Sequence, residues 1–482
     1  MIFTSSPKLL DNIREGAKLS LNERVKLTLQ LSAPAIIAQI SSIAMQFIDA
    51  SMVGHLGADA SASIGLIMTT TWLLWGLLTS MGTGFSVQIA HHVGGNNHEH
   101  ARSVVRQSLV FCTFYSVLIA IIGCSISGVL PVWLGGEEQI REGASIYFLI
   151  FCLSIPALQL EFLAGAILRC SGNMNVPSIL NVMMCALDVI FNFFFIFPTR
   201  DVSLMGLQLT IPGVGLGIVG AALGTALAEV ITAILMLWFL CCRSRELAII
   251  RIKGSWRVTR QCVRKALVIG IPIGCERVIL SGAQILITVI VAPLGIYSIA
   301  ANAFAITAES LCYMPGYGIA EAATTLIGQS IGAGRRALTK SFAWISVILG
   351  MSVMTVMGVL MYVFAPFLME MMTSVSEIQS LGVMALRTEA WAEPMFAASI
   401  VCYGVFVGAG KTIVPSIMNL GSMWAVRLTL AAWLAPIMGL HGVWIAMCIE
   451  LCFRGTIFLL RLRYGAWMPK DLKPVYATQQ IQ

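Results

Sequence analysis

Charged residues are scarce in this sequence of 482 residues. Only 11% of the residues are Asp, Glu, Lys or Arg, whereas 58% are hydrophobic. An average soluble domain carries about 25% charged residues, so water is not the main solvent of this chain. A membrane protein of this length has room for about twelve spanning helices, because each helix needs roughly 20 apolar residues.

The sequence also lacks the short motifs of several enzyme, pump and channel classes. HExxH, GxSxG, the P-loop GxxxxGK[ST] and a filter-like repeat are all absent. The 13 cysteines have neither metal nor disulfide spacing, and we expect them to pack as small hydrophobic residues. The His-rich stretch 91–100 has no paired ligands at i and i+4, which argues against a metal site. We therefore expect no catalytic residues and no cofactor.

No cleavable signal peptide is visible before the first apolar stretch. Residues 1–27 carry Lys8, Arg14, Lys18, Arg24 and Lys26, and the apolar stretch that follows is too long for a signal sequence. We expect the first spanning helix to serve as the targeting signal.

Apolar stretches recur along the chain and predict an all-α integral membrane protein with twelve spanning helices. Lipid cannot satisfy backbone polar groups, so each stretch must be helical. Their approximate limits are 28–53, 63–90, 104–132, 144–168, 176–197, 214–241, 266–292, 297–328, 341–370, 381–407, 413–436 and 440–460. The domains follow as a cytosolic segment 1–27, an N-lobe 28–241 (helices one to six), a cytosolic linker 242–265, a C-lobe 266–463 (helices seven to twelve) and a cytosolic tail 464–482.

The basic residues alternate between the connections and set the orientation. With both termini in the cytosol, 24 of the 30 Lys and Arg residues lie on the cytosolic side, as the positive-inside rule requires. We therefore predict a multi-pass protein of the inner (plasma) membrane. The net charge of +7 follows from this topology and needs no nucleic acid as partner. Membrane lipids are the expected partners, and residues 251–265 are expected to lie along anionic headgroups.

An internal repeat divides the chain into two related halves. A shift of 238 residues superimposes Pro34 on Pro272, Leu56-Gly57 on Leu294-Gly295, Gly94 on Gly332, Pro156 on Pro394, Gly172 on Gly410, and Val176-Pro177-Ser178-Ile179 on Val414-Pro415-Ser416-Ile417. Six spans is an even number, so both halves keep the same orientation. We predict two pseudo-symmetric six-helix bundles related by an axis along the membrane normal, as in transporters with parallel repeats.

Acidic residues within the predicted spans are candidates for function, because a charge at the bilayer centre costs roughly 3 kcal/mol. In the first span, Gln39, Ser42, Gln46 and Asp49 form one helical stripe; in the fifth, Asn181, Cys185, Asp188 and Asn192 form another. Two carboxylates with amides and hydroxyls can hold a proton or a small hard cation. We predict cation coupling at Asp49 and Asp188, with a structural hydrogen bond or helix cap as the alternative.

The second half carries a different set of acids. We expect Glu276, Glu389 and Glu393, together with Gln46, to line the substrate cavity and attract organic cations. The alternative is a set of structural ion pairs, namely Glu276 with Arg277, Glu389 with Arg387 and Glu450 with Arg454. Glu161, Glu229, Glu309 and Glu321 are further intramembrane acids without an assigned role.

These residues resemble the multidrug and toxic compound extrusion (MATE) family over about residues 25–460. The resemblance is carried by Pro34 with Phe47-Ile48-Asp49 and Gly54-His55-Leu56-Gly57, by Arg169-Cys170-Ser171-Gly172-Asn173, and by Met314-Pro315-Gly316-Tyr317 through Gly332-Ala333-Gly334. It implies a V-shaped antiporter that exchanges protons or sodium ions for organic cations or amphiphilic drugs by rocking between two states. We expect it to act as a monomer.

The resemblance also implies roles for particular residues. Asp49 matches the acid of the first helix in the cation site, and Pro34 matches the proline at which that helix bends. Asp188 and Asn192 stand where many members have Asn and then Asp, so their order is swapped here. Thr225 matches a hydroxyl of the same site, to which Asn181 is also assigned. A lipid-linked oligosaccharide flippase of the same superfamily is the alternative, although it would favour a basic cavity and often fourteen spans.

Overall fold

The computed structural model describes residues 8–204, 207–250, 252–465 and 467–469. Most of the predicted tail 464–482, and Arg251 of the linker, lie outside the described residues. The first half consists of α1 (Lys8–Arg14), α2 (Leu21–Gly54), α3 (Ala58–Gly94), α4 (His98–Ile126), α5 (Leu130–Trp133), α6 (Glu138–Cys170), α7 (Asn175–Ile196), the antiparallel hairpin β1 (Pro198–Leu204) and β2 (Leu207–Val214), and α8 (Ile218–Trp238).

The second half begins after the linker and is helical throughout its described residues. It consists of α9 (Arg260–Val291), α10 (Ile296–Gly332), α11 (Arg336–Met372), α12 (Ser376–Glu389), α13 (Glu393–Gly408), α14 (Ile413–Gly421), α15 (Thr429–Met438) and α16 (Leu440–Tyr464). A π-helical segment, Ser422–Leu428, joins α14 to α15. Helices such as α2 and α3 extend past the predicted apolar stretches, because a helix continues into the headgroup region where polar residues are tolerated, whereas α8 is shorter than the predicted 214–241.

The all-α membrane fold is confirmed, but the number of twelve spans is not. Among the described residues, ten helices are long and apolar enough to cross a membrane, and an eleventh span arises if α12 and α13, bent by 60°, count as one. Pro394 at the start of α13 explains this break, because proline lacks a backbone N–H and clashes with the preceding turn. Helix α10 occupies the eighth predicted stretch, but Glu309 and Glu321 lower its hydropathy, and it is not among the candidate spans.

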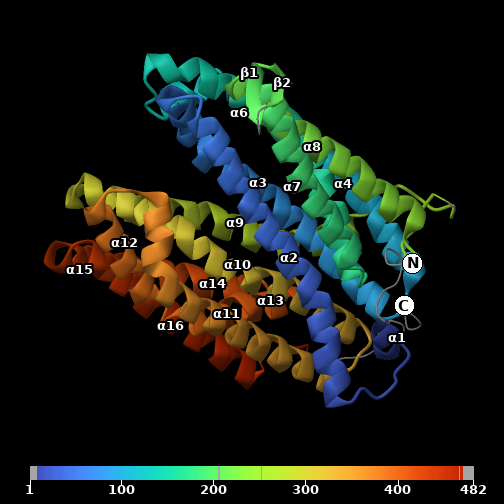
Figure 1. The fold of residues 1–482 in the computed structure, drawn as a ribbon. Helices are drawn as coiled ribbons and strands as arrows, with labels where there is room; N and C mark the ends of the chain where they lie inside the picture. Colours follow the sequence, from blue (N-terminus) through green and yellow to red (C-terminus); the bar gives the residue numbers. More distant parts are fainter. Residues whose placement is uncertain (1–7, 205–206, 251, 466, 470–482) are drawn as a thin grey trace.

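The two halves form two bundles that meet at one end and diverge at the other (Figure 1). The end at which they meet holds α1 and the turns that follow α3, α6, α10 and α13 (residues 95–97, 171–174, 333–335 and 409–412), and we call it the closed end. The hairpin β1–β2 and the outer ends of α12 and α15 lie at the diverging end, which we call the open end. The architecture is therefore V-shaped, as predicted.

Contacts at the closed end reproduce the repeat of the sequence. A Cβ atom on Gly94 would collide with the carbonyl group of Gln329, and a Cβ on Gly332 would collide with the carbonyl group of His91. Gly94 and Gly332 are 238 residues apart, as are His91 and Gln329. Each half thus offers the same surface to the other, which is the mark of a two-fold contact. The pseudo-two-fold axis runs through this end of the molecule.

Small residues carry the packing of α3 against α9 from the closed end to the middle of the molecule. A Cβ on Gly84 would touch Ala266, and Cβ atoms on Gly270 and Gly274 would approach Ser80 within 2.9 and 3.1 Å. In the 238-residue repeat, Ser80 corresponds to Gly318 of α10, and Ile36 of α2 corresponds to Gly274. Gly318 faces Ile36 just as Gly274 faces Ser80. The α3–α9 and α2–α10 contacts are therefore equivalent.

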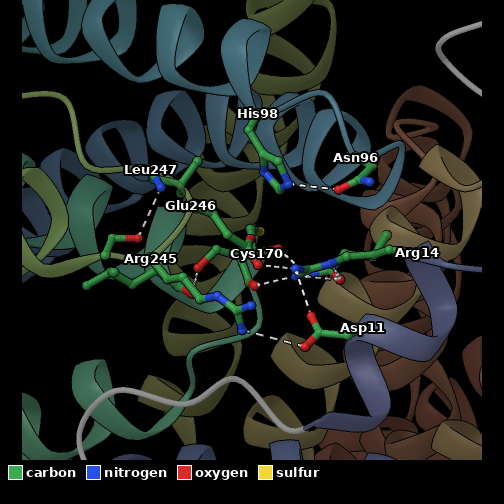
Figure 2. A network of polar contacts seen from close by, with 12 residues as sticks. Asp11, Arg14, Asn96, His98, Cys170, Arg245, Glu246 and Leu247 are labelled. Atoms are coloured by element: carbon green, nitrogen blue, oxygen red, sulfur yellow. Dashed lines mark hydrogen bonds and ion pairs between the residues drawn. The ribbon is translucent and has the colours of Figure 1, made fainter. Parts of the chain in front are cut away.

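The short helix α1 ties both halves together at the closed end (Figure 2). The Arg14 guanidinium donates to the carbonyl oxygen of Ser171 (2.9 Å), which belongs to the first half, and to Oε1 of Gln329 (3.2 and 3.3 Å), which belongs to the second half. It also pairs with Glu246 and with Asp11. The α1 side chains Leu10 and Ile13 are fully buried in a core cluster built largely from α10, α11, α13 and α16.

Candidate functional site

A carboxylate of α2 and a carboxylate of α7 meet around one amide group. The Nδ2 atom of Asn192 donates to Oδ1 of Asp49 over 3.0 Å and to Oδ2 of Asp188 over 3.2 Å. Asp188 and Asn192 are one helical turn apart on α7, so both point at the same face of α2. The two polar stripes predicted from the sequence therefore do meet within the first half.

The α7 side of this site is closed to solvent, and the α2 side is open. Asp188 and Asn192 are each 1% exposed, whereas Asp49 is half-buried. Among the described residues, neither Oδ1 of Asp188 nor Oδ1 of Asn192 has a hydrogen-bond partner. A buried oxygen without a partner costs about 1–3 kcal/mol. Two acceptor atoms are therefore available for a proton or a cation that enters past Asp49.

Helix α8 approaches the site closely because it has glycine where it faces α7. A Cβ atom on Gly224 would collide with the side chain of Asn192, and one on Gly220 would collide with the backbone at Phe195. This approach brings Thr225, the next residue, beside the Asp188 carboxyl group. The hydroxyl predicted for this site therefore does lie beside it.

Two further side chains surround the acids. Tyr147 of α6 lies within electrostatic range of Asp49, Asp188 and Glu229. Glu229 lies one turn beyond Thr225 on α8 and is 9% exposed. Nothing in the sequence predicted Tyr147 as a site residue, because aromatic residues are common in spanning helices. Glu229 was visible as an intramembrane acid, but only the packing of α6 and α8 against α7 places it near Asp188.

Asn181 lies nearer the closed end and does not contact the two acids. Its Nδ2 atom donates to the carbonyl oxygen of Ala38 (3.2 Å) and to Oγ of Ser42 (2.9 Å). It therefore joins α2 to α7 two turns away from Asp188. Pro34 lies within α2, which runs as one helix from Leu21 to Gly54, and its role as a hinge stays a prediction.

In the second half, Glu276 is held by two neutral donors. Tyr403 of α13 donates to its Oε2 atom and Asn419 of α14 to its Oε1 atom, each over 2.7 Å. Asn419 is the repeat equivalent of Asn181, and Glu276 is the equivalent of Ala38. The same asparagine thus joins the first and fifth helices of each half, once to a carbonyl group and once to a carboxylate.

Glu389 and Glu393 lie elsewhere, at the break between α12 and α13. Both are 0% exposed, and their carboxylate oxygens have no hydrogen-bond partner from the rest of the described chain. Glu309 of α10 lies directly beside Glu389. Gln46 is exposed on α2. Among the described residues, no hydrogen bond or ion pair joins Gln46, Glu276 and the Glu389–Glu393 pair, so their common role at a substrate cavity stays a prediction.

The predicted ion pairs of the second half have different outcomes. Glu450 and Arg454 do pair, with 3.2 Å between Oε1 and Nε. Within the described chain, no ion pair joins Arg277 to Glu276 or Arg387 to Glu389, so the structure does not show these two alternatives. Arg387 instead donates to the carbonyl oxygen of Tyr362 (3.3 Å) and lies over the ring of that residue. Side chains one residue apart on a helix point about 100° apart, and those two residues apart about 200°, so neither pair shares a helix face.

A family model covers both halves of the chain. The model described as MatE matches residues 34–194 and again residues 272–433. The two matched ranges fall in the two halves, so the repeat of this sequence is also the repeat of the family.

Named relatives match over nearly the full length. The probable multidrug resistance protein NorM of Thermotoga maritima is 23% identical over 445 residues, which are 92% of this chain and 93% of that protein. The probable multidrug resistance protein NorM of Idiomarina loihiensis is 26% identical over 452 residues, 90% of this chain and 93% of that protein. A solved structure titled as the outward-facing conformation of a multidrug resistance MATE family transporter of the MOP superfamily superimposes with a TM-score of 0.85 at 20% identity, covering 95% of this chain and 98% of that one.

Proposed function

The chain belongs to the MatE family of multidrug transporters, and on this premise we propose that it is a secondary antiporter that exports organic cations or amphiphilic drugs in exchange for protons. The relatives' printed names concern multidrug resistance, which supports a small-molecule substrate. The coupling ion and the rocking cycle are our proposals from the geometry of the site.

One observation carries the coupling proposal, namely the contact between Asp49 and Asp188. The two carboxyl groups lie beside each other, because the single Asn192 nitrogen donates to both. Like charges at this distance cannot both stay ionised, which favours uptake of a proton by the pair. Sodium remains the alternative ion, since the free oxygens of Asp188 and Asn192 are hard ligands.

The proposed cycle uses the V shape. Basic residues gather at the closed end, where Arg14, Arg102, Arg106, Arg245 and Arg335 lie, and this supports a cytosolic orientation of that end in the inner (plasma) membrane by the positive-inside rule. The open end accordingly faces outward, and both termini lie in the cytosol. Protons enter from outside past Asp49, the drug leaves, and the halves rock about the closed-end contacts. A proton can shift this equilibrium only by binding the two states with different affinity.

The remaining assignments follow from this scheme. Asp49, Asp188, Asn192 and Thr225 form the coupling site, and Asn181 supports it by holding α2 against α7. Gln46, Glu276, Glu389 and Glu393 are proposed to act on the substrate, with Glu276 held ready by Tyr403 and Asn419. Pro34 is the proposed hinge of α2. The transporter acts as a monomer among membrane lipids.

Purified protein in proteoliposomes tests the coupling. We expect Asp49→Asn to lower ethidium transport driven by a pH gradient at least tenfold, because the pair can then no longer bind and release a proton. Asp59→Asn, at the exposed start of α3, is the matched control and is expected to transport at the wild-type rate. Equal transport by Asp49→Asn and the control would overturn the assignment.

Separate gradients distinguish the ions and the alternative function. We expect a pH gradient alone to drive transport, and a sodium gradient alone to drive none. Transport driven only by sodium would replace the proton in the scheme. Movement of a lipid-linked oligosaccharide without any gradient would favour the flippase instead.

A further inference from the structure

Arg169 lies between two acids that belong to different halves of the molecule. It is the last residue but one of α6, and its Nε atom is 3.5 Å from Oε2 of Glu321 on α10. Its guanidinium nitrogens lie 3.5 and 3.8 Å from the place that a Cβ on Gly165 would occupy, so the side chain runs back along its own helix. Glu161, one turn before Gly165 on the same face, lies within electrostatic range of Arg169. One cation therefore faces Glu321 across the interface and Glu161 on its own helix.

The Arg169–Glu321 pair is part of the contact that seals the closed end. Thr325 lies one turn after Glu321 on α10, and its hydroxyl group donates to the carbonyl oxygen of Arg169 (3.1 Å). One turn further along α10, Nε2 of Gln329 donates to the carbonyl oxygen of Cys170 (2.8 Å). Three successive turns of α10 therefore hold the end of α6. Separation of the halves at this end must break the ion pair and leave the guanidinium without its partner on α10.

The repeat shows that only one of two equivalent contacts carries this ion pair. In the 238-residue repeat, Arg169 corresponds to Val407 and Glu321 corresponds to Thr83. Val407 is buried in a small apolar cluster with Val87 of α3. The equivalent contact thus closes by apolar packing, without a charge at either position. The ion pair lies instead on α6, in the half that carries the proposed coupling acids, so a role in coupling explains it better than a need for adhesion.

A third acid connects Glu161 to the coupling site. Glu229 of α8 is 9% exposed and lies within electrostatic range of both Glu161 and Asp188. Helix α8 runs from the hairpin at the open end toward the closed end, so Glu229 lies on the closed-end side of Thr225. The acids therefore follow one another toward the closed end, from Asp49 and Asp188 to Glu229 and then to Glu161.

Glu161 is half-buried, and Arg169 and Glu229 are the charged groups that face it. It forms no ion pair within the part of the chain that the structure describes. The ionisable side chains of α3 lie in its first and last turns, and the charged ones of α4 lie toward its start. Arg106 of α4 is engaged elsewhere, since it donates to the carbonyl oxygen of Ile252 in the linker (2.6 Å). Among the described residues, Arg169 is thus the cation available to Glu161.

We propose that Glu161 is a second proton-binding residue of the transport cycle, and that Arg169 exchanges Glu321 for Glu161 when the closed end opens. While the closed end is sealed, Arg169 pairs with Glu321, and Glu161 holds a proton. Opening frees the guanidinium, which pairs with Glu161 as the proton leaves the carboxyl oxygen for water on the cytosolic side. The exchange is driven by the difference in attraction of Arg169 to the neutral and the ionised acid, which is large away from water. The proposal rests on the proton-coupled function above and adds the residues that link opening to proton release.

Two substitutions next to the same arginine should shift the protein in opposite directions. Distances between spin labels across the closed end report the open and sealed populations of the purified full-length protein, without drug or gradient. We expect Glu161→Gln, which imitates the protonated acid, to lower the open-to-sealed ratio roughly tenfold at alkaline pH. Glu321→Gln should raise the ratio roughly tenfold, because it removes the partner of the sealed state. These values are the lower end of the range for a hydrogen bond to a charged group, since the pair is partly exposed.

The pH dependence separates this exchange from a purely structural role. In the wild-type protein the open-to-sealed ratio should rise with pH, because opening releases protons. Glu161→Gln should flatten this rise by as much as tenfold per pH unit, the contribution of one proton. Arg169→Gln removes the shared cation, so adding Glu161→Gln to it should change nothing, whereas Arg169→Lys should keep part of the rise. Glu99→Gln, at an exposed position at the start of α4, is the matched control and should behave as wild type.

Three results would overturn the proposal: no shift in Glu161→Gln, a shift in the same direction as that of Glu321→Gln, or an undiminished pH dependence in Glu161→Gln. The spin-label measurement needs no ion gradient, so its outcome is separate from that of the transport assays. Normal transport by Asp49→Asn with the opposite shifts intact would remove the coupling site and leave the exchange at Arg169 standing. Loss of transport in Asp49→Asn without the opposite shifts would leave the coupling site and remove the exchange.

Discussion

The Nδ2 atom of Asn192 lies 3.0 Å from Oδ1 of Asp49, across the interface of two helices, and 3.2 Å from Oδ2 of Asp188 on its own helix. One amide nitrogen therefore holds both acids of the proposed coupling site. It fixes their separation while leaving Oδ1 of Asp188 without a partner in the described chain. The amide thus positions the acids and does not itself carry the proton.

Replacement of this amide should uncouple transport from the proton gradient. Asn192→Leu keeps a side chain of similar size but removes the donor, so the carboxyl groups lose the atom that holds them together. We expect the proton release that follows drug addition, measured with a pH-sensitive dye, to fall at least fivefold. Drug binding in detergent should stay within about twofold of wild type, because the substitution is buried in the first half. Undiminished proton release by Asn192→Leu would contradict the positioning role.

The contacts of α1 should stabilise the state in which the closed end is sealed. Arg14 reaches Ser171 in one half and Gln329 in the other, and separation of the halves must break one of these contacts (Figure 2). Leu10 and Ile13 are buried mainly among second-half residues, so we expect α1 to move with that half and to release Ser171 and Glu246.

Arg14→Ala should therefore shift the population toward the state that is open at this end. Charge-assisted hydrogen bonds contribute about 1.5–3 kcal/mol each, so we expect the sealed fraction to fall by tenfold or more relative to the opened one. Distances between spin labels placed on either side of the closed end report both populations. Lys18→Ala, at an exposed position between α1 and α2, is the control. An unchanged distance distribution in Arg14→Ala would rule out a stabilising role for α1.

The glycine contact at the same end should tolerate no side chain. A Cβ on Gly332 would collide with the backbone of His91, which cannot move as a flexible side chain could. We expect Gly332→Ala to prevent full closure and to lower drug transport at least tenfold. Gly54→Ala, where a Cβ would meet nothing within 4 Å, should transport normally. Thermal stability measured in detergent separates this effect from misfolding. Normal transport by Gly332→Ala would show that the closed end can accommodate a methyl group at this position.

The sequence predicted the fold class and the duplication well, because both depend on local properties. Hydropathy locates the spanning helices because their side chains must be apolar where they contact lipid. The 238-residue repeat is visible in the matching positions of Pro and Gly. The spans were harder to delimit at α10 and at the α12–α13 break. Intramembrane acids lower the hydropathy of α10, and Pro394 interrupts the helix between α12 and α13, although both segments belong to the helical bundle.

The contacts between side chains of different helices were harder to predict from the sequence than the helices themselves. The contact of Asp49 with Asn192 and Asp188 could be predicted from the polar stripes of their helices. Polar side chains avoid lipid, so two polar stripes within one bundle tend to face each other. A pair between Glu276 and Arg277 was the alternative to a cavity role, because the two residues are adjacent in sequence. On a helix adjacency turns side chains apart, and Glu276 found Tyr403 and Asn419, more than 120 residues away.

The sequence by itself thus determined that the chain is a duplicated helical membrane protein with acids concentrated on particular helix faces, because periodicity and the cost of charge in lipid act residue by residue. Only the tertiary structure decided which face meets which. It placed Tyr147 and Glu229 near the coupling acids, gave Glu276 the donors Tyr403 and Asn419, and set Arg277 of α9 against Gly76 of the other half. The physical reason is that close helix packing depends on glycines such as Gly224 and Gly274, whose effect is set by the partner helix and not by their own neighbours in sequence.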